Sequence, residues 1–253
     1  MYDIPVLTPR SPEEAAEAFG DGSDVTVLAG GTILLPEITY GRAKPKRVLM
    51  LARSGLGRIE RSNGTVTIGA AVSVAELVEG DEPLATAARY VGDPEVRAQA
   101  TVGGNLCAPP GESPRGDLQA PLLVLGARVR STGNGGERTE SVEDFLAGGS
   151  ERRLVLDVSY DDVDRKTGYA AFWRPHTHHY TILAVAAARG NGELRLAATG
   201  TGPSAVRLTS VEQSGNPEDA VKDVDPADDV LASAWYRKRI LPRLVARALE
   251  GIG

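Results

Sequence analysis

The stretch Asp93-Pro94-Glu95-Val96-Arg97-Ala98-Gln99-Ala100-Thr101-Val102-Gly103-Gly104-Asn105-Leu106 contains the most specific pattern in the chain. A second glycine pair occurs upstream, in Ala29-Gly30-Gly31-Thr32-Ile33, directly after the apolar run Val25-Thr26-Val27-Leu28. Adjacent glycines permit positive φ angles and let a ligand approach bare backbone. Successive N–H groups in such a turn can bind an anion. Two glycine turns with threonine hydroxyls beside them therefore predict a ligand that contains two linked phosphates.

The composition is that of an ordinary globular protein, and it excludes several classes of function. The 253 residues are 42% hydrophobic and 25% charged, with a net charge of −6. This charge argues against nucleic acid as the main partner, because phosphate binding needs a basic face. Residues 1–15 lack the regions of a signal peptide, and no apolar run is long enough to span a membrane. We therefore expect a cytoplasmic protein without a membrane span.

The cysteine content limits which cofactors this chain could hold by itself. Cys107 is the single cysteine of the sequence. An internal disulfide is therefore impossible, and so is an iron–sulfur cluster held only by cysteines of this chain. Any cluster that works with this protein must come from a partner.

Capping and periodicity signals predict short helices and strands, with a change of character near residue 162. The clearest helix starts are Ser11 before Pro12, and Ser73 with Glu76 in a capping box. Residues 132–140, rich in glycine and charge, are expected to form a turn or loop. Residues 168–199 mix strand and helix signals, and Pro242 is expected to kink the last helix. The expected helices are residues 11–19, 74–78, 83–90, 117–125 and about 226–249, and the expected strands are 24–28, 47–51, 65–68, 127–131 and 154–158.

The glycine pairs match neither of two common nucleotide-binding motifs. GxGxxG and GxxxxGK[ST] are both absent, which disfavours a nicotinamide Rossmann domain and a P-loop NTPase. The arrangement instead resembles the flavin-binding subunit of the molybdenum hydroxylases, the group of xanthine dehydrogenase and carbon monoxide dehydrogenase. The segments that carry the resemblance, in the family's order over nearly the whole chain, are Ala29-Gly30-Gly31-Thr32, Thr67-Ile68-Gly69-Ala70, Asp93-Pro94-Glu95-Val96-Arg97, Thr101-Val102-Gly103-Gly104-Asn105-Leu106, Gly116-Asp117-Leu118 and Ala232-Ser233-Ala234-Trp235-Tyr236-Arg237.

The resemblance implies an α+β chain with the FAD-binding fold of the p-cresol methylhydroxylase and vanillyl-alcohol oxidase type. That fold consists of two α/β subdomains, which are expected here at about residues 1–55 and 56–162. A C-terminal α+β domain, like that of the carbon monoxide dehydrogenase flavoprotein, is expected at residues 163–253.

The resemblance also implies which residues bind FAD. Residues 29–33 would wrap the diphosphate through backbone N–H groups, and residues 101–105 would line its second side, near the ribityl chain. Asp117 would accept hydrogen bonds from ribityl or ribose hydroxyls, or cap the helix that follows it. Leu106 would pack against the flavin ring or belong to the core. The expected cofactor-binding residues are Ala29, Gly30, Gly31, Thr32, Ile33, Thr101, Gly103, Gly104, Asn105, Leu106 and Asp117.

Residues 169–180 depart from the family's pattern. Many relatives have a lysine soon after an aromatic residue, then arginine, then Asp-x-Ala. Here the lysine is absent, and His179 or Tyr180 stands where the aspartate is expected. The candidate neighbours of the flavin ring, with no catalytic residue certain, are Trp173, Arg174 and Tyr180.

All three histidines of the chain, His176, His178 and His179, fall in this same segment. Their spacing puts the imidazoles on different faces of a helix or a strand, so no metal site is expected. No histidine lies near either glycine pair, so the FAD is expected to be bound non-covalently.

No hydrolytic triad or pair of catalytic carboxylates is evident, and a flavin carries out its own electron chemistry. The resemblance implies an FAD-dependent oxidoreductase subunit that receives electrons from [2Fe-2S] clusters of a partner and passes them to NAD, oxygen or a quinone. A large molybdopterin-binding partner would oxidise the substrate. Two alternatives stay open: a standalone flavin oxidase or dehydrogenase of a small organic substrate, and a scaffold subunit that has lost its flavin.

Overall fold

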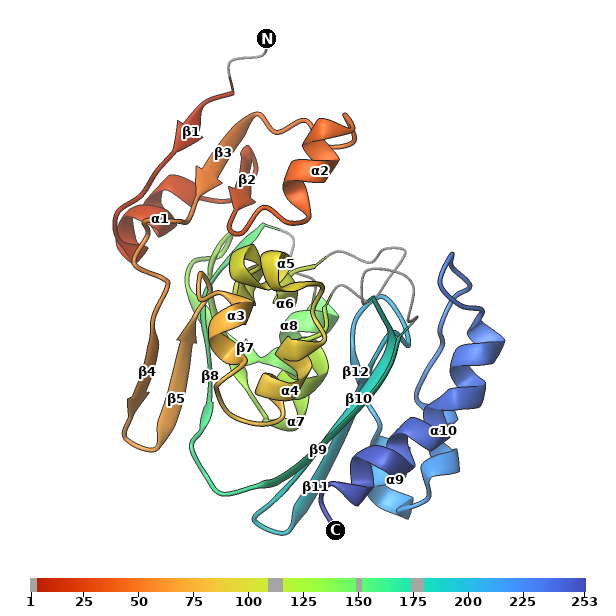
Figure 1. Ribbon diagram of the computed structural model, residues 1–253. Helices are drawn as coiled ribbons and strands as arrows, with labels where there is room; N and C mark the ends of the chain where they lie inside the picture. Colours follow the sequence, from red (N-terminus) through yellow and green to blue (C-terminus); the bar gives the residue numbers. More distant parts are fainter. Residues whose placement is uncertain (1–3, 109–115, 149–151, 174–179) are drawn as a thin grey trace.

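Three β-sheets, each built from its own stretch of chain, organise the molecule (Figure 1). The computed structural model describes residues 4–108, 116–148, 152–173 and 180–253. Helices accompany every sheet, so the α+β class predicted from the sequence is confirmed. The boundaries expected at about residues 55 and 162 fall in the connections between sheets.

The N-terminal sheet is small and parallel, and its strands are joined by helices. Its strands, in sheet order, are β1 (Val6–Leu7), β3 (Arg47–Met50) and β2 (Val25–Leu28). Its helices are α1 (Pro12–Phe19) and α2 (Leu34–Thr39). The Ser11 hydroxyl accepts a hydrogen bond from Glu14 N, which confirms the expected start of α1. Phe19 and Leu49 are buried in the core that this sheet shares with β8 residues.

The middle sheet is antiparallel throughout, and six helices accompany it. Its strands, in sheet order, are β4 (Ile59–Ser62), β5 (Thr65–Gly69), β8 (Arg153–Asp161), β6 (Arg128–Gly133) and β7 (Arg138–Ser141). The helices are α3 (Val74–Leu77), α4 (Leu84–Arg89), α5 (Pro94–Gln99), α6 (Val102–Leu106), α7 (Gln119–Val124) and α8 (Val142–Gly148). Ser73 and Glu76 form the expected capping box at α3.

The turn or loop expected at residues 132–140 is the turn of a β-hairpin, and strands β6 and β7 occupy the two ends of that range. Strand β6 extends to Gly133 and pairs with β7, and Gly135 and Gly136 make the turn at φ angles of 84° and 83°. Arg153, which is 8% exposed, donates to Asn134 O and Gly136 O at 3.0 and 3.1 Å. The glycines therefore mark only the turn, and a buried arginine from β8 fixes the hairpin.

The C-terminal sheet is antiparallel and covered on both faces. Its strands, in sheet order, are β12 (Val206–Arg207), β11 (Glu193–Thr199), β10 (Thr181–Gly190) and β9 (Lys166–Trp173). They are followed by α9 (Thr209–Ser214), the 3₁₀ helix η1 (Pro217–Lys222) and α10 (Ala234–Glu250). Helix α7 contacts β10 and β11, and α10 contacts β9 and β10 (Figure 1). Residues 181–188 are consequently all buried.

Two expectations for this part of the chain are wrong. The mixed signals at residues 168–199 belong to three consecutive strands, because small alanines on both faces of β10 allow the close covering by helices. The last helix starts after Ser233, whose hydroxyl accepts from Tyr236 N, rather than near residue 226. Pro242 lies inside this single helix.

Candidate functional site

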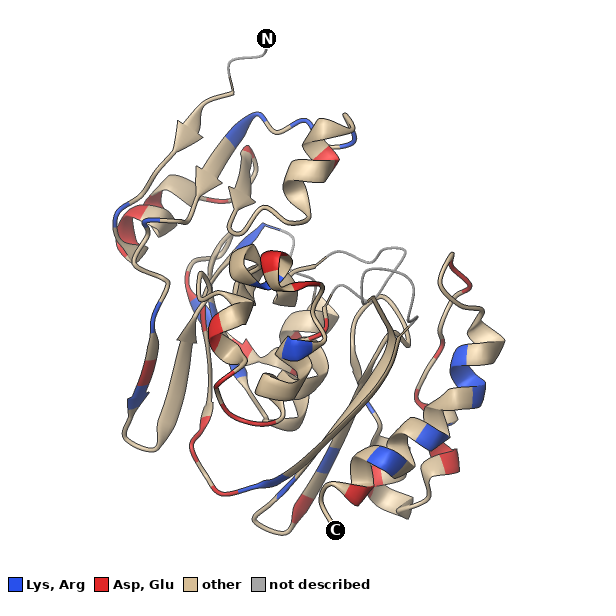
Figure 2. Ribbon diagram, viewed as in Figure 1, with Lys and Arg blue, Asp and Glu red and all other residues tan. Residues whose placement is uncertain are grey.

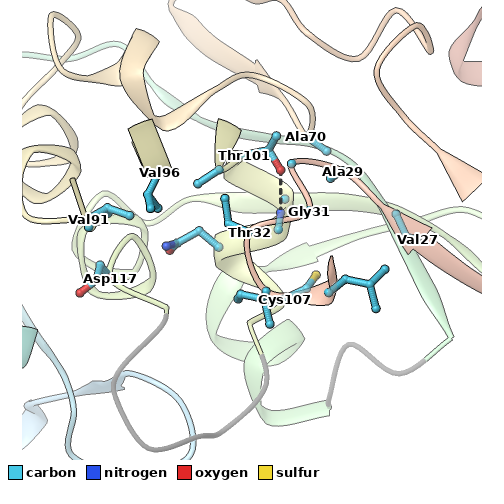
Figure 3. A pocket seen from close by; sticks show the side chains of 18 of the residues that line it. Val27, Ala29, Gly31, Thr32, Ala70, Val91, Val96, Thr101, Cys107 and Asp117 are labelled. Atoms are coloured by element: carbon cyan, nitrogen blue, oxygen red, sulfur yellow. Dashed lines mark hydrogen bonds between the residues drawn. The ribbon is translucent and has the colours of Figure 1, made fainter. Parts of the chain in front are cut away.

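A cavity of about 760 Å³ opens where the N-terminal sheet, the α5–α6 segment and the first residues of β10 meet (Figure 3). Its volume lies within the range of small-molecule and cofactor sites. Most of the expected site residues line it, together with aromatic and aliphatic side chains. The expected residues found in the lining are Ala29, Gly30, Gly31, Thr32, Ile33, Thr101, Gly103, Gly104, Asn105, Asp117 and Tyr180.

The first glycine pair forms an open turn between β2 and α2. Gly31 has a φ of 75°, which bends the chain so that its carbonyl accepts from Leu35 N at the start of α2. The backbone N–H groups of residues 30–33 donate no hydrogen bond to any described residue. Consecutive N–H groups left free at a cavity wall suit an anion, because together they present several donors to one negatively charged group.

The two glycine motifs are in direct contact through Gly30. A Cβ atom placed on Gly30 would lie 1.8 Å from Gln99 O and 3.0 Å from Ala100 Cα. No residue with a side chain fits there without moving backbone. The missing side chain therefore lets residues 29–33 lie against the residues that lead into Thr101, and both motifs face one cavity.

The second glycine pair is not the anion-binding turn that the sequence predicts. Residues 102–106 form the short helix α6, with Thr101 as its N-cap. Val102 N donates to Val72 O at 3.0 Å, and Gly103 N to the Ala70 carbonyl at 2.9 Å. Gly104 N donates to Thr101 Oγ1 at 3.2 Å.

This segment therefore offers a ligand no free N–H at its first turn, and its glycines have packing roles instead. A Cβ on Gly103 would lie 2.8 Å from Ala70 Cβ, so the glycine permits α6 to lie against the end of β5. Gly104 is exposed, and a Cβ there would meet only Thr101 Oγ1, at 3.0 Å. The contribution of this motif to the cavity is a smooth wall and the threonine hydroxyl.

Asp117 lies at the opposite side of the cavity, before α7 (Figure 3). It is 6% exposed, and its Oδ1 has no hydrogen-bond partner among the described residues. Burial raises the pKa of its carboxyl from the usual 3.8 to about 7, and the neighbouring Thr181 hydroxyl lowers it in part. The Asp117 side chain does not cap α7, whose first residues show no side-chain cap. The carboxyl is thus available to a ligand.

The segment that carries Asp117 is fixed by two amide side chains. Asn105 Oδ1 accepts from Leu118 N at 2.9 Å, so this oxygen positions the Asp117 segment. Gln119, 3% exposed, donates from Nε2 to Leu106 O and accepts at Oε1 from Ala205 N, both at 2.9 Å. These bonds join α6, α7 and the C-terminal sheet behind the cavity.

Leu106 does not line the cavity. It is 1% exposed and belongs to the main core cluster of the middle sheet. Of the two roles considered for it from the sequence, the structure therefore supports the core role and corrects the expected contact with a flavin ring.

Aromatic residues line the end of the cavity near β9 and β10. Tyr180 is 48% exposed and lines the cavity. Trp173 does not line the cavity. Its ring packs on the ring of Tyr90, with 5.1 Å between the ring centroids, and Tyr90 does line the cavity. The third candidate, Arg174, and the three histidines lie outside the described residues. A flat aromatic ligand would find suitable surfaces at this end.

Three lining features were missed from the sequence. Thr181 is 2% exposed, and its only sequence signal is a hydroxyl at the start of an apolar run. Tyr90, at the end of α4, has no distinguishing local pattern. Glu37 and Arg42 pair at 2.7 Å beside α2, five residues apart and without a motif.

Within the described ranges, no group of three or more His, Cys, Asp or Glu side chains is placed to hold a metal ion. Figure 2 shows acidic and basic residues interspersed along most elements, with several basic residues along α10. Among the helices of the described residues, none has the length and apolar character that crossing a bilayer requires.

Comparison with known proteins identifies the family. The sequence pattern described as "FAD binding domain in molybdopterin dehydrogenase" matches residues 2–159. The chain belongs to this family of FAD-binding domains. FAD is accordingly its cofactor, and the resemblance to flavin-binding subunits of molybdenum hydroxylases is confirmed.

Relatives of this FAD-binding family extend the match to the whole chain. The carbon monoxide dehydrogenase medium chain of Hydrogenophaga pseudoflava is 26% identical over 278 aligned residues, which cover 96% of this chain and 94% of the relative. The glyceraldehyde dehydrogenase medium chain of Sulfolobus acidocaldarius is 28% identical over 274, with 96% of each chain covered.

A solved structure is similar over the same length. It is carbon monoxide dehydrogenase from H. pseudoflava, in a form that lacks the Mo-pyranopterin moiety of the molybdenum cofactor. A chain of it superposes with a TM-score of 0.85 and 26% identity, covering 98% of this chain and 96% of that one. The fold expected from the resemblance is thereby confirmed, including the C-terminal part that the family pattern does not reach.

Proposed function

We propose that this chain is the FAD-binding, electron-transferring medium subunit of a molybdenum hydroxylase-type oxidoreductase. Two relatives of nearly full length are named as medium chains of dehydrogenases, which supports a role as one subunit of a larger enzyme. In this proposal, electrons arrive from [2Fe-2S] clusters of a small partner, and a large molybdopterin-binding partner oxidises the substrate. The final acceptor is NAD, oxygen or a quinone, and the location is cytoplasmic.

The residues of the cavity fit the chemical parts of FAD. The free N–H groups of residues 30–33 are donors for the diphosphate, which carries about two negative charges. Asp117 Oδ1, buried without a partner, is an acceptor for a sugar or sugar-alcohol hydroxyl. Tyr90 and Tyr180 offer aromatic surfaces for a ring.

When bound, FAD supplies the one- and two-electron chemistry, and the protein supplies binding, orientation and electrostatics. Residues 30–33 would hold the anionic centre of the molecule against the N-terminal sheet. The wall made by Thr101, Gly103 and Gly104 would exclude water from its second side. Asp117 would fix a hydroxyl on the side of the C-terminal sheet. No residue of this chain needs to act as a general acid or base in this role.

The observation that carries the proposal is the turn at residues 30–33, with four N–H groups unused at the wall of a cofactor-sized cavity. The test is to purify the full chain and titrate it with FAD. We expect one FAD per chain, with a flavin absorption spectrum, and release of the flavin by acid without proteolysis because binding is non-covalent. A colourless protein that takes up no added FAD would indicate the scaffold alternative.

A second experiment tests the assembly. Affinity purification of the tagged chain from its native host should recover iron and molybdenum with the flavin, because the partners hold the clusters and the molybdopterin. Recovery of a flavoprotein alone, which oxidises a small organic substrate without partners, would favour the standalone enzyme.

A further inference from the structure

Buried polar atoms without partners point to a second cofactor-binding residue. In the described part of the chain, the buried side-chain atoms without a hydrogen bond are Asp117 Oδ1, Tyr169 Oη, Thr181 Oγ1, Arg237 Nε and Glu140 Oε1, and the last of these is ion-paired with Arg138 Nε at 2.6 Å. Only Asp117 and Thr181 among them also line the cavity. A buried hydroxyl or carboxyl without a hydrogen bond costs about 1–3 kcal/mol, so native structures satisfy nearly all of them. Two such atoms in one cavity therefore indicate a ligand that satisfies both.

Asp117 and Thr181 reach the same place from different sheets. Asp117 precedes α7, in the segment that Asn105 and Gln119 hold in position. Thr181 is the first residue of β10, in the C-terminal sheet. Both side chains line the same cavity, and the two segments meet where Thr199 Oγ1 of the C-terminal sheet donates to Gly116 O, next to Asp117, at 3.4 Å. The cavity is thus closed on one side by residues from both parts of the chain.

The pair has the chemistry to bind a hydroxyl group. A carboxylate only accepts hydrogen bonds, whereas a threonine hydroxyl both donates and accepts. A ligand hydroxyl can donate to the first and accept from the second at the same time. A phosphate oxygen would instead be repelled by the carboxylate when that group is ionised.

The neighbouring side chains indicate which hydroxyl this is. Tyr180, next to Thr181 in sequence, lines the cavity, and Trp173 is the register partner of Thr181 on β9. The Trp173 ring packs on Tyr90, which lines the cavity as well. The hydroxyl-binding pair therefore lies at the aromatic end, where a flavin ring and its ribityl chain would meet, and away from the turn at residues 30–33.

We propose that Thr181 and Asp117 together form a two-sided site for a hydroxyl of the ribityl chain of FAD, with Thr181 as the cofactor-binding residue contributed by the C-terminal sheet. This inference rests on the proposed function, since it names a further residue of the same site. It assigns the C-terminal sheet a direct part in holding the cofactor.

The test compares FAD affinity in three variants of the full chain, measured from the quenching of flavin fluorescence. Thr181→Val removes the hydroxyl with little change of shape and should weaken FAD binding about tenfold. Thr181→Ser keeps the hydroxyl and should bind FAD within about twofold of the wild type. Thr167→Val is the matched control, because it makes the same substitution at the far end of the C-terminal sheet, where Thr167 pairs with Ala188 and does not line the cavity. It should leave FAD affinity unchanged.

Analogues of the ligand make the test independent of protein folding. An FAD analogue with a deoxygenated ribityl chain should bind the wild type about tenfold more weakly, and Thr181→Val should then cause no further loss. FAD made with 2′-deoxyadenosine should bind like FAD, since the adenosine ribose is not the group bound here. If Thr181→Val binds FAD as tightly as the wild type, or if only the deoxyadenosine analogue is impaired, the inference is wrong. If the wild type itself binds no FAD, the proposed function is wrong, and the inference that rests on it is wrong as well.

Discussion

Gly30 is the residue at which the backbones of the two glycine motifs are in closest contact. Its position leaves no room for a Cβ atom, because the carbonyl of Gln99 occupies that space at 1.8 Å. Gly104 is a useful contrast, since its Cβ position meets only the Thr101 hydroxyl, at 3.0 Å. Close packing at Gly30, rather than a positive φ angle, is the reason for glycine there.

We expect Gly30→Ala to lower the free energy of unfolding by about 2 kcal/mol or more, because the methyl group must push the two backbone segments apart. Urea unfolding of the cofactor-free protein measures this change. Gly104→Ala serves as the control and should cost less than about 1 kcal/mol. Equal midpoints for Gly30→Ala and the wild type would show that the segments are not in contact.

Asp117 should make the stability of the cofactor-free protein depend on pH. Its pKa is about 7 when folded and 3.8 when unfolded, so between these values the folded state holds a proton that the unfolded state has lost. Folding is therefore favoured at low pH, and this contribution is lost as the pH rises from about 4 to about 7. The full effect is at most about 4 kcal/mol.

The variant Asp117→Asn, which cannot titrate, isolates this effect. Relative to the wild type, the variant should have a higher free energy of unfolding at pH 7.5 than at pH 5. Urea unfolding at both pH values measures it. A constant difference would mean that the carboxyl is solvated in the folded protein.

At the residue scale, sequence reasoning located the cavity lining well, because glycines, threonines and an aspartate in a fixed order leave a visible pattern. It could not locate Thr181 or Tyr90, which reach the cavity only through the packing of β10 and α4. The environment of Asp117 was likewise invisible, since burial depends on residues far away in sequence.

Among the elements, the junction behind the cavity is held by Gln119. This side chain connects the end of α6 at Leu106 O with Ala205 N, just before β12. A Cβ on Gly116 would lie 2.4 Å from Gln119 Cδ, so the Gln119 amide packs closely against the Gly116 backbone. The cavity wall and the C-terminal sheet are thus joined through one buried amide.

Replacing Gln119 with leucine should destabilise the protein by about 2–4 kcal/mol, because Leu106 O and Ala205 N would both lose their buried partner. Thermal and urea unfolding measure the loss. Gln213→Leu, on the exposed side of α9, is the matched control and should stay within about 0.5 kcal/mol of the wild type. Similar stabilities for the two variants would rule out the bridging role.

The sequence predicted elements best where capping chemistry is local. The starts of α1 and α3 follow from Ser11 and Ser73 with their partners three residues on. Helix α6 was missed because two glycines disfavour a helix, and only its contact with Ala70 makes them useful there. Strand β6 was expected at residues 127–131, whereas β7 was missed because the glycines and charges beside it are typical of a turn or loop.

At the scale of the whole molecule, the cavity joins parts of the chain that are far apart in sequence. Its walls come from the N-terminal sheet, the α5–α6 segment and β10 (Figures 1 and 3). A ligand that contacts all three stabilises only the arrangement in which they are assembled. The order of the family's motifs made this arrangement predictable. The covering of both faces of the C-terminal sheet by helices α7 and α10 could not be predicted from the sequence.

FAD at about one hundred times its dissociation constant should raise the melting temperature by about 5–10 °C, because binding to the folded state adds about 2.7 kcal/mol. Differential scanning calorimetry measures the shift. Riboflavin and AMP, added together at the same concentration, lack the linked phosphates and should give a much smaller rise. An equal rise with the two fragments would argue against an anchor at the diphosphate.

The most direct measurement is a crystal structure of the chain reconstituted with FAD. The account predicts diphosphate oxygens at about 2.7–3.2 Å from backbone nitrogens within residues 30–33, the hydrogen-bond range for N–H donors. Thr101 and Gly104 should form the opposite wall without donating backbone hydrogen bonds to the phosphates. A diphosphate held mainly by the N–H groups of α6, or one lying outside the cavity, would contradict it.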